Sequence, residues 1–150
     1  MAGTSETLTS KDVRIFLNDF PKANRLSGEA EFDPVRIQKA IKFVIDQWNE
    51  TPPITRRYTD EDFPYKSCLL YGVVGWLFMG EATFQERNHL VYQSGGLSVD
   101  DDNSAAAYLN FANYFMGLFR EQMKIQKMSE NLKLGWGTIN SSYRGYEGYW

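Results

Sequence analysis

The most constraining feature of the sequence is an unbroken run of apolar and glycine residues, CLLYGVVGWLFMG, from Cys68 to Gly80. A helix that is apolar on every side is buried, so this run predicts the central helix of a bundle. The run is shorter than the roughly 20 residues that a bilayer requires, and we expect no membrane span. Gly72, Gly75 and Gly80 each weaken the helix by about 1 kcal/mol relative to alanine, which predicts close approach of a neighbouring helix.

Two helices are predicted before this run. The first spans residues 11–20, opens with capping-box spacing at Thr9 and Asp12, and ends at Pro21. Its predicted apolar face comprises Val13, Phe16, Leu17 and Phe20. The second begins after Asp33, an N-cap acid followed by proline, and ends at the double proline of NETPP. Its residues recur with helical spacing on one broad apolar face: Ile37, Ile41, Val44, Ile45 and Trp48.

The central helix is predicted from about Pro64 to Asn88, after the loop ITRRYTDEDFPYK. A small β-hairpin or wide turn is expected in LVYQSGGLSV. A last helix opens with DDDNS and extends to about Leu134, and its basic end, KIQKMSENLK, suits the negative end of the helix dipole. The predicted inner face of this helix comprises Ala105, Tyr108, Ala112, Phe115, Phe119 and Met123. We expect Trp48 and Trp76 to be buried between the helices.

These elements predict a mainly all-α fold, a bundle of about four helices with a small β-hairpin or turn and an extended C-terminal arm. Residues 1–134 would form the bundle domain and residues 135–150 the arm. The last ten residues, SSYRGYEGYW, hold three tyrosines and a tryptophan but no Val, Ile, Leu or Phe. Their glycines and their lack of periodicity argue for an arm that becomes ordered on binding a partner. The alternative, that they fold back on the bundle, stays open.

Composition excludes several classes of protein. Of 150 residues, 43% are hydrophobic and 23% charged, as in globular chains. A formal charge of -3 argues against a nucleic-acid reader, which normally has a basic surface. The single cysteine cannot form an internal disulfide, and its apolar surroundings predict a buried thiol in a reducing compartment. The first ten residues lack the features of a signal peptide, so we expect a cytoplasmic, soluble protein.

The sequence contains no recognisable catalytic or metal-binding constellation. His89 is the only histidine, and no G-x-S-x-G motif accompanies it. One histidine and one cysteine make a poor zinc site. The acidic clusters 60–62 and 100–102 lack a calcium-loop pattern, and each precedes a predicted helix, so capping explains them better. We expect no enzyme activity, no cofactor and no metal.

The order of the elements and several sequence segments resemble those of a known protein family. The segments are DVRIFLND, FDPVRIQKAIKFVIDQWNETPP, FPYKSCLLYGVVGWLF, RNHLVYQSGGLSVDDDNSAAAY and SSYRG. From about Asp12 onward the chain resembles the head-to-tail adaptor proteins of the tailed-bacteriophage neck, also called connector or head-completion proteins. The resemblance implies a homo-oligomeric ring, typically twelve-fold, beneath the portal protein. The ring would support the next neck or tail protein and surround a channel through which genomic DNA passes without specific binding. The chain would then belong to the virion neck, and to the host cytoplasm during assembly.

The resemblance also implies that the C-terminal arm docks on the portal. The candidate portal-binding residues are Tyr143, Arg144, Tyr146, Tyr149 and Trp150. The ends of the last helix and the Gly95–Gly96 turn are candidates for contacts between subunits. Three other hypotheses stay open: a tail-completion or stopper protein of the virion, which is commonly β-rich; a cytoplasmic helical module that binds and regulates an enzyme; and an uncharacterised enzyme.

Overall fold

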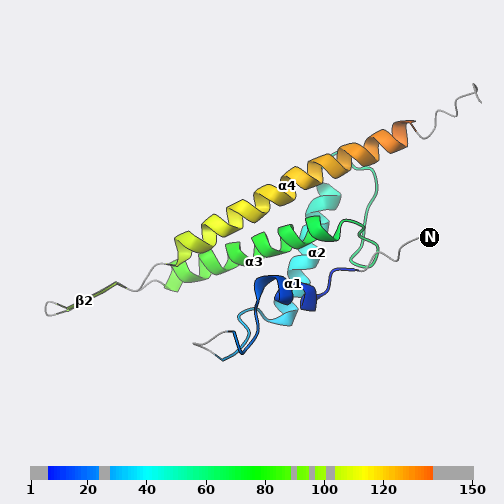
Figure 1. Ribbon diagram of the computed structural model, residues 1–150. Coiled ribbons are helices and arrows are strands. Elements are labelled where there is room, and N and C mark those ends of the chain that lie inside the picture. The colour runs from blue at the N-terminus through cyan, green and yellow to red at the C-terminus, as the bar shows by residue number, and fades with distance from the viewer. Residues whose placement is uncertain (1–6, 24–27, 89–90, 95–96, 101–103, 137–150) are drawn as a thin grey trace, which may run out of the picture.

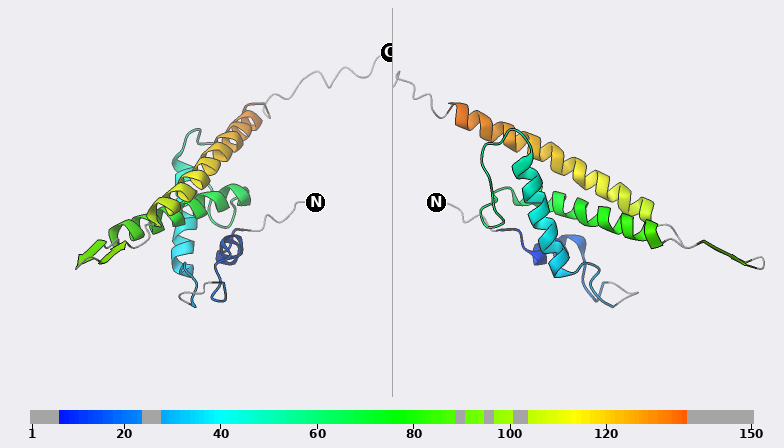
Figure 2. Two further views of the ribbon diagram at one scale, coloured as in Figure 1. Left: turned by 60° about the vertical axis from the view of Figure 1, so that its left-hand side comes forward. Right: turned by 180° about the vertical axis from the view of Figure 1, so that it is seen from behind.

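The computed structural model describes residues 7–23, 28–88, 91–94, 97–100 and 104–136. These ranges contain α1 (Ser10–Leu17), α2 (Pro34–Glu50), α3 (Lys66–Asn88), β1 (Val91–Ser94), β2 (Leu97–Asp100) and α4 (Ala105–Trp136). The long helices α3 and α4 lie side by side, and α2 crosses them obliquely on the far side (Figures 1 and 2). The mainly all-α fold predicted from the sequence is confirmed.

Local signals in the sequence determine where the first two helices begin. The Thr9 side chain accepts a hydrogen bond from the Asp12 backbone, and the Asp12 carboxylate accepts one from the Thr9 N–H at 2.9 Å. This is the predicted capping box. At the start of α2 the Asp33 carboxylate accepts a hydrogen bond from the Val35 N–H at 3.1 Å, with proline at the first helical position. Both helices therefore begin where a side chain satisfies their free backbone donors.

The predicted end and apolar face of α1 are partly wrong. The helix ends at Leu17 rather than at residue 20, because Asn18 adopts a left-handed backbone with φ 54° and closes the last turn. Pro21 follows the helix without ending it. Val13 is buried as the pattern predicts, whereas Phe16 stays exposed and packs edge-on against aromatic rings of α3 and α4.

The central position of α3 depends on two of its glycines. A Cβ atom at Gly72 would lie 2.5 Å from Val44 Cγ1 of α2 and 2.9 Å from Phe119 Cδ2 of α4. A Cβ atom at Gly75 would lie 2.7 Å from Met116 Cγ of α4. These distances are too short for real contacts, so both neighbouring helices pack against bare backbone. The close approach predicted from the glycines is confirmed at Gly72 and Gly75, whereas at Gly80 a Cβ atom would meet only the end of the Arg36 side chain.

The two predicted core tryptophans differ. Trp48 is fully buried, and its ring lies 5.0 Å from that of Phe63 and 5.2 Å from that of Tyr65. The prediction for Trp76 is wrong, because this residue is only partly buried. Its ring stacks on Phe43 of α2 at 5.6 Å, and Phe43 is itself exposed. An apolar run on the central helix therefore extends past the core to the surface.

Length and composition alone would allow α3 to cross a membrane, since its most apolar window has a mean hydropathy of 1.3. Half of that window is buried inside the bundle. The helix also contains Glu81, a buried carboxylate that forms an ion pair with Arg36 of α2. Burial of this extent is typical of a core helix, and α3 packs between α2 and α4.

The predicted β-hairpin is confirmed, because its two strands pair with each other. β1 and β2 are antiparallel, with Val91 opposite Asp100 and Ser94 opposite Leu97. The two strands continue beyond the ends of α3 and α4 (Figure 1).

The last helix is longer than predicted. With 32 residues, α4 measures about 48 Å at 1.5 Å per residue. It continues through Gly135 to Trp136, so Gly135 does not stop it. Its predicted inner face is buried at Ala105, Ala112, Phe119 and Met123, and partly buried at Tyr108 and Phe115.

The contact at Gly72 predicts the outcome of a matched pair of substitutions. Gly72→Ala should destabilise the protein, because an overpacking cost of about 1–3 kcal/mol exceeds the gain of up to about 1 kcal/mol in helix propensity. Gly117→Ala on α4 should stabilise it by up to about 1 kcal/mol, since a Cβ atom there meets nothing within 4 Å. Urea denaturation of both variants measures the difference. Equal stabilisation by the two alanines would refute the close packing at Gly72.

Candidate functional site

Most residues that the sequence singled out for function lie outside the described part of the chain. This holds for the five candidate portal-binding residues between 143 and 150, and for His89. Cys68 is buried against the Phe119 carbonyl, and burial raises the pKa of its thiol to about 12. A thiol with so high a pKa is unreactive at neutral pH.

The predicted capping role of the first acidic cluster is wrong. α3 begins at Lys66, and the Asp62 carboxylate instead accepts hydrogen bonds from the backbone and hydroxyl of Thr59, at 2.6 and 2.9 Å. Arg56 forms an exposed ion pair with the same carboxylate at 3.0 Å. Asp62 therefore closes a turn inside the 51–65 loop. Of the second cluster, Asp100 ends β2, and the other two acids lie outside the described residues.

The densest polar cluster of the described residues surrounds Glu130, on α4. Its carboxylate accepts three hydroxyl hydrogen bonds from the 51–65 loop: from Thr55 at 2.5 Å, Tyr58 at 2.5 Å and Tyr65 at 2.6 Å. Burial alone would raise the pKa of Glu130, but these hydrogen bonds and the nearby Lys127 outweigh it and lower the pKa. The two tyrosines respond in the opposite sense: burial and the carboxylate raise the pKa of Tyr58 to about 12 and that of Tyr65 as well.

Lys127, one turn before Glu130, is almost completely buried. Its ammonium donates hydrogen bonds to the backbone carbonyls of Thr51 and Pro53 and lies 5.4 Å from the centre of the Trp48 ring. Burial lowers the pKa of this amine, partly opposed by Glu130. The sequence places Lys127 in a basic end of the helix that suits its dipole, but α4 ends at Trp136, and Lys127 is buried well before that end.

Together these contacts attach the 51–65 loop to α4. The Asn49 side chain holds the same loop on α2, because it donates to the Tyr58 carbonyl at 2.8 Å and accepts from the Tyr58 N–H at 2.9 Å. The charged groups and hydroxyls of the cluster already have partners within the fold, which leaves none of them free to act on a substrate. Among the described residues no group of His, Cys, Asp and Glu is placed to hold a metal ion. The role of the cluster is best explained as structural: it holds the 51–65 loop against α4.

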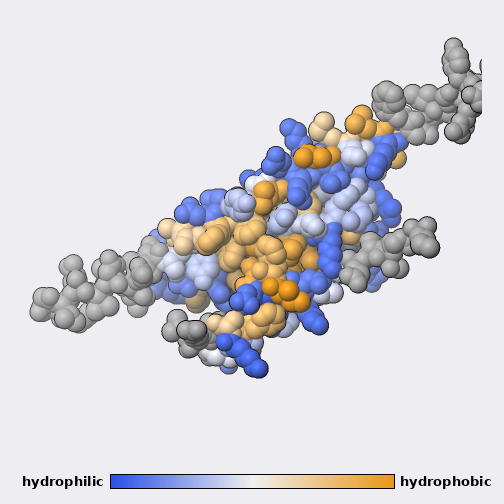
Figure 3. All heavy atoms as spheres, in the orientation of Figure 1, coloured by the Kyte–Doolittle hydropathy of each residue, from blue (hydrophilic) through white to orange (hydrophobic). Residues whose placement is uncertain are grey.

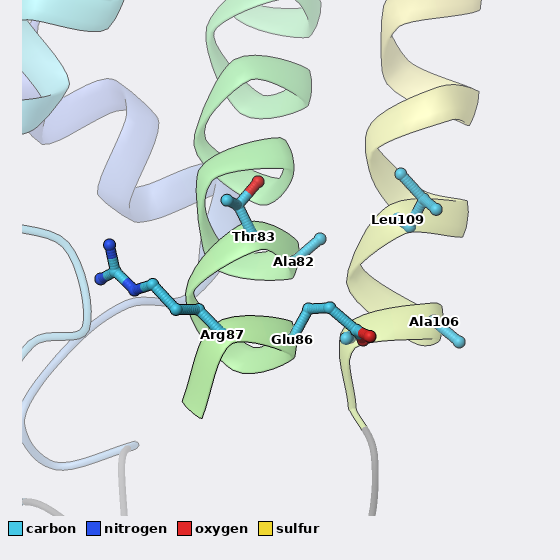
Figure 4. Close-up of a pocket in the computed structure, with 7 residues that line it drawn as sticks. Ala82, Thr83, Glu86, Arg87, Ala106 and Leu109 are labelled. Atoms are coloured by element: carbon cyan, nitrogen blue, oxygen red, sulfur yellow. The ribbon is translucent and has the colours of Figure 1, made fainter. Parts of the chain in front are cut away.

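A hollow of about 560 Å³ opens between the end of α3 and the start of α4. Figure 4 shows its lining, in which Ala82 and Ala106 leave space, while Glu86 extends toward the first turn of α4 and Arg87 points away. A ligand site normally brings a few convergent polar groups into an enclosed cavity. This hollow is open, its lining mixes small residues with Glu86, Arg87 and Leu109, and Arg87 points away, as expected where two helices separate.

The surface carries far more large apolar side chains than the hollow does. Figure 3 shows apolar residues gathered across the middle of one face, over α3 and α4. Separately, aromatic side chains of three helices form one connected set of ring contacts: Phe16 of α1, Tyr71 and Phe78 of α3, and Phe111 and Phe115 of α4. Of this set Phe16 and Phe111 are exposed, whereas the other three rings are partly buried.

One side of α4 faces away from α3 and is apolar along most of its length. We call it the outer stripe: Ala107, Phe111, Tyr114, Leu118, Glu121, Ile125, Met128 and Leu132. Its five largest exposed apolar residues, Phe111, Tyr114, Ile125, Met128 and Leu132, each keep more than half of their surface exposed. A second surface, the α2–α3 patch, consists of Phe43, Trp76 and Met79. The sequence reasoning missed both surfaces because it followed only the inner face of each helix.

Comparison with protein-family models, with curated proteins and with solved structures finds no match to this chain.

The Glu130 cluster predicts a pH-dependent loss of stability. Glu130→Gln should cost about 1–3 kcal/mol at pH 7, because three partly buried hydroxyls lose a charged acceptor. The folded-state pKa of Glu130 lies below its ordinary value of 4.5, so the advantage of the carboxylate is complete above that value. It should disappear as the pH falls through the lower, folded-state pKa. Denaturant unfolding of both proteins from pH 7 to pH 3 measures the gap.

Glu61→Gln is the matched control, since Glu61 is exposed on the same loop and should change stability little at any pH. A gap between wild type and Glu130→Gln that stays constant down to pH 3 would contradict the assignment.

Proposed function

We propose that this protein is a structural component of the neck of a tailed bacteriophage. It would form a ring of identical subunits between the portal and the next neck or tail protein, around the channel for DNA. The layout of the chain, with its capped second helix, apolar central helix, hairpin and long last helix, resembles head-to-tail adaptors and supports this proposal.

The observation that supports the ring most directly is the pair of separate exposed apolar surfaces. A ring of identical subunits is built from heterologous contacts, in which one face of each subunit meets a different face of the next. The outer stripe lies on the side of α4 that is turned away from α3, whereas the α2–α3 patch lies on the side where α2 packs. A monomeric protein of this size rarely exposes so many large apolar side chains.

The alternatives are less well supported. A tail-completion or stopper protein is expected to be β-rich, and the described residues contain four helices and a single two-stranded hairpin. A module that regulates an enzyme through a small ligand would need an enclosed polar pocket, and the hollow in Figure 4 is open, with Arg87 pointing away from it. An enzyme would need a reactive group, and the described Cys68 is buried with a raised pKa.

Mass spectrometry of purified virions tests the proposal. The chain should be present in a copy number that matches a ring, with about twelve copies expected from the resemblance. Absence of the chain from particles would refute this proposal and the stopper alternative together. A copy number of one or two per particle would exclude the ring alone.

The proposed docking of the C-terminal arm gives a further prediction. A chain truncated after Ile139 should keep its helicity and melting temperature, because the described bundle ends at Trp136. It should nevertheless fail to join DNA-filled heads that carry a portal but no tail. The tyrosines and the tryptophan beyond residue 139 are typical interface anchors, and a ring multiplies the weak binding of each arm.

Co-sedimentation of truncated and full-length protein with such heads measures the binding. Equal binding would show that the arm does not dock. An unfolded truncated chain would show that residues 140–150 belong to the core of the bundle.

A further inference from the structure

The outer stripe of α4 has the spacing of a coiled-coil seam. Its residues follow one another at alternating steps of four and three, from Ala107 to Leu132. This 3.5-residue repeat keeps one apolar line facing a partner helix over several turns. A small ligand would need a pocket, whereas a continuous stripe about 38 Å long fits the length of another helix.

The stripe contains one charged residue, Glu121, near its middle. A charge buried in an apolar contact is costly unless the partner supplies the opposite charge. The partner surface should therefore be apolar, helical and basic at one point.

The α2–α3 patch of a second copy has these properties. Phe43, Trp76 and Met79 supply an apolar surface, and the exposed Lys39 lies one turn before Phe43 on α2. The helix α2 has 17 residues, about 25 Å, which matches much of the stripe in length.

Pairing of α4 with α4 of another copy fits the charge less well. A parallel pair would place Glu121 beside Glu121 of the second copy, and like charges at a seam oppose association. An antiparallel pair that matches Phe111 with Met128 would place Glu121 against Leu118, so that no cation lies opposite the carboxylate. The contact with the α2–α3 patch is the arrangement that supplies Lys39.

We propose that the outer stripe of one subunit docks on the α2–α3 patch of the next copy of this chain, with Glu121 facing Lys39. This contact joins two different faces, so repetition of it produces a closed ring or an open filament. The contact itself follows from the two surfaces. Only the closure of the assembly into a ring rests on the proposed function.

Cysteine cross-linking with a short bis-maleimide tests the contact in the full-length protein. Cys68 can stay in place, because its buried thiol has a pKa of about 12 and should not react. A mixture of Leu118→Cys and Phe43→Cys subunits should give a covalent dimer, and each variant alone should not. A chain with both cysteines should give a ladder of multimers. Ile15→Cys mixed with Leu118→Cys is the control, since Ile15 is an exposed residue of α1 outside both surfaces.

Two outcomes of the cross-linking would overturn the proposal. A covalent dimer from Leu118→Cys alone would show that α4 pairs with α4. No cross-link from the mixed pair, both in concentrated solution and in particles, would show that the two surfaces do not meet.

Substitutions at the stripe provide an independent measurement of association. Ile125→Asp should lower the association constant about tenfold or more, because it places an unpaired charge in the seam. Ile15→Asp is the matched control, since Ile15 and Ile125 are 56% and 58% exposed. Both variants should keep the helicity of the monomer.

A charge exchange tests the pairing of Glu121 with Lys39. Glu121→Lys should also weaken association, and Lys39→Glu in the same chain should restore it. Equal association of all these variants would refute the contact.

The failure of the proposed function and the failure of this inference can be told apart. If virions lack the chain while the mixed cysteines still cross-link, the contact stands and the phage assignment fails. If virions contain a ring that incorporates Ile125→Asp as well as wild type, the ring stands and the contact fails.

Discussion

The approach of α4 and α2 to the bare backbone of α3 at Gly72 determines the architecture of the bundle. Two neighbours, Val44 and Phe119, occupy the space that a single methyl group would need. The glycines weaken α3 as an isolated helix. In the bundle they allow close contact along the helix, and packing contributes more than propensity to helical stability in a folded protein. The position of α4, and with it the direction of its outer stripe, follows from this contact.

Hydrogen bonds of the Lys127–Glu130 cluster attach the 51–65 loop to the C-terminal half of α4. Burying an ammonium and a carboxylate costs free energy unless each finds good partners. Here the ammonium has two carbonyls and an aromatic ring, and the carboxylate has three hydroxyls. Most of these partners come from the 51–65 loop, so the cost is offset only when that loop takes one conformation. The cluster therefore gives specificity to a segment that lacks helix or strand hydrogen bonds, and it keeps Phe63 and Tyr65 over the ring of Trp48.

Much of the fold could be predicted because its signals are local. The capping box at Thr9, the Asp33–Pro34 start and the double proline after Glu50 each act within a few residues.

The errors in the prediction have nonlocal causes. Lys127 looks like a solvated lysine until the 51–65 loop brings carbonyls from about 75 positions earlier in the chain. Trp76 belongs to an apolar run, but whether it is buried depends on how far α2 covers α3, which no local pattern records. The predicted portal-binding residues lie beyond Trp136, outside the described part of the chain.

α4 illustrates why a function of this kind is difficult to recognise in one sequence. A helix with one apolar face shows a clear amphipathic pattern, whereas apolar residues on two opposite faces partly cancel that pattern. The inner face of α4 follows Ala112, Phe119 and Met123, and the outer stripe follows Tyr114, Ile125 and Leu132. Both lines use steps of three and four, so the sequence predicts the inner line without showing that the outer line is left uncovered. Once Gly75 and Met116 fix which side meets α3, the second line is left without a partner in the described chain. An apolar line of that length on a stable helix is therefore an argument for assembly, independent of any resemblance to a known family.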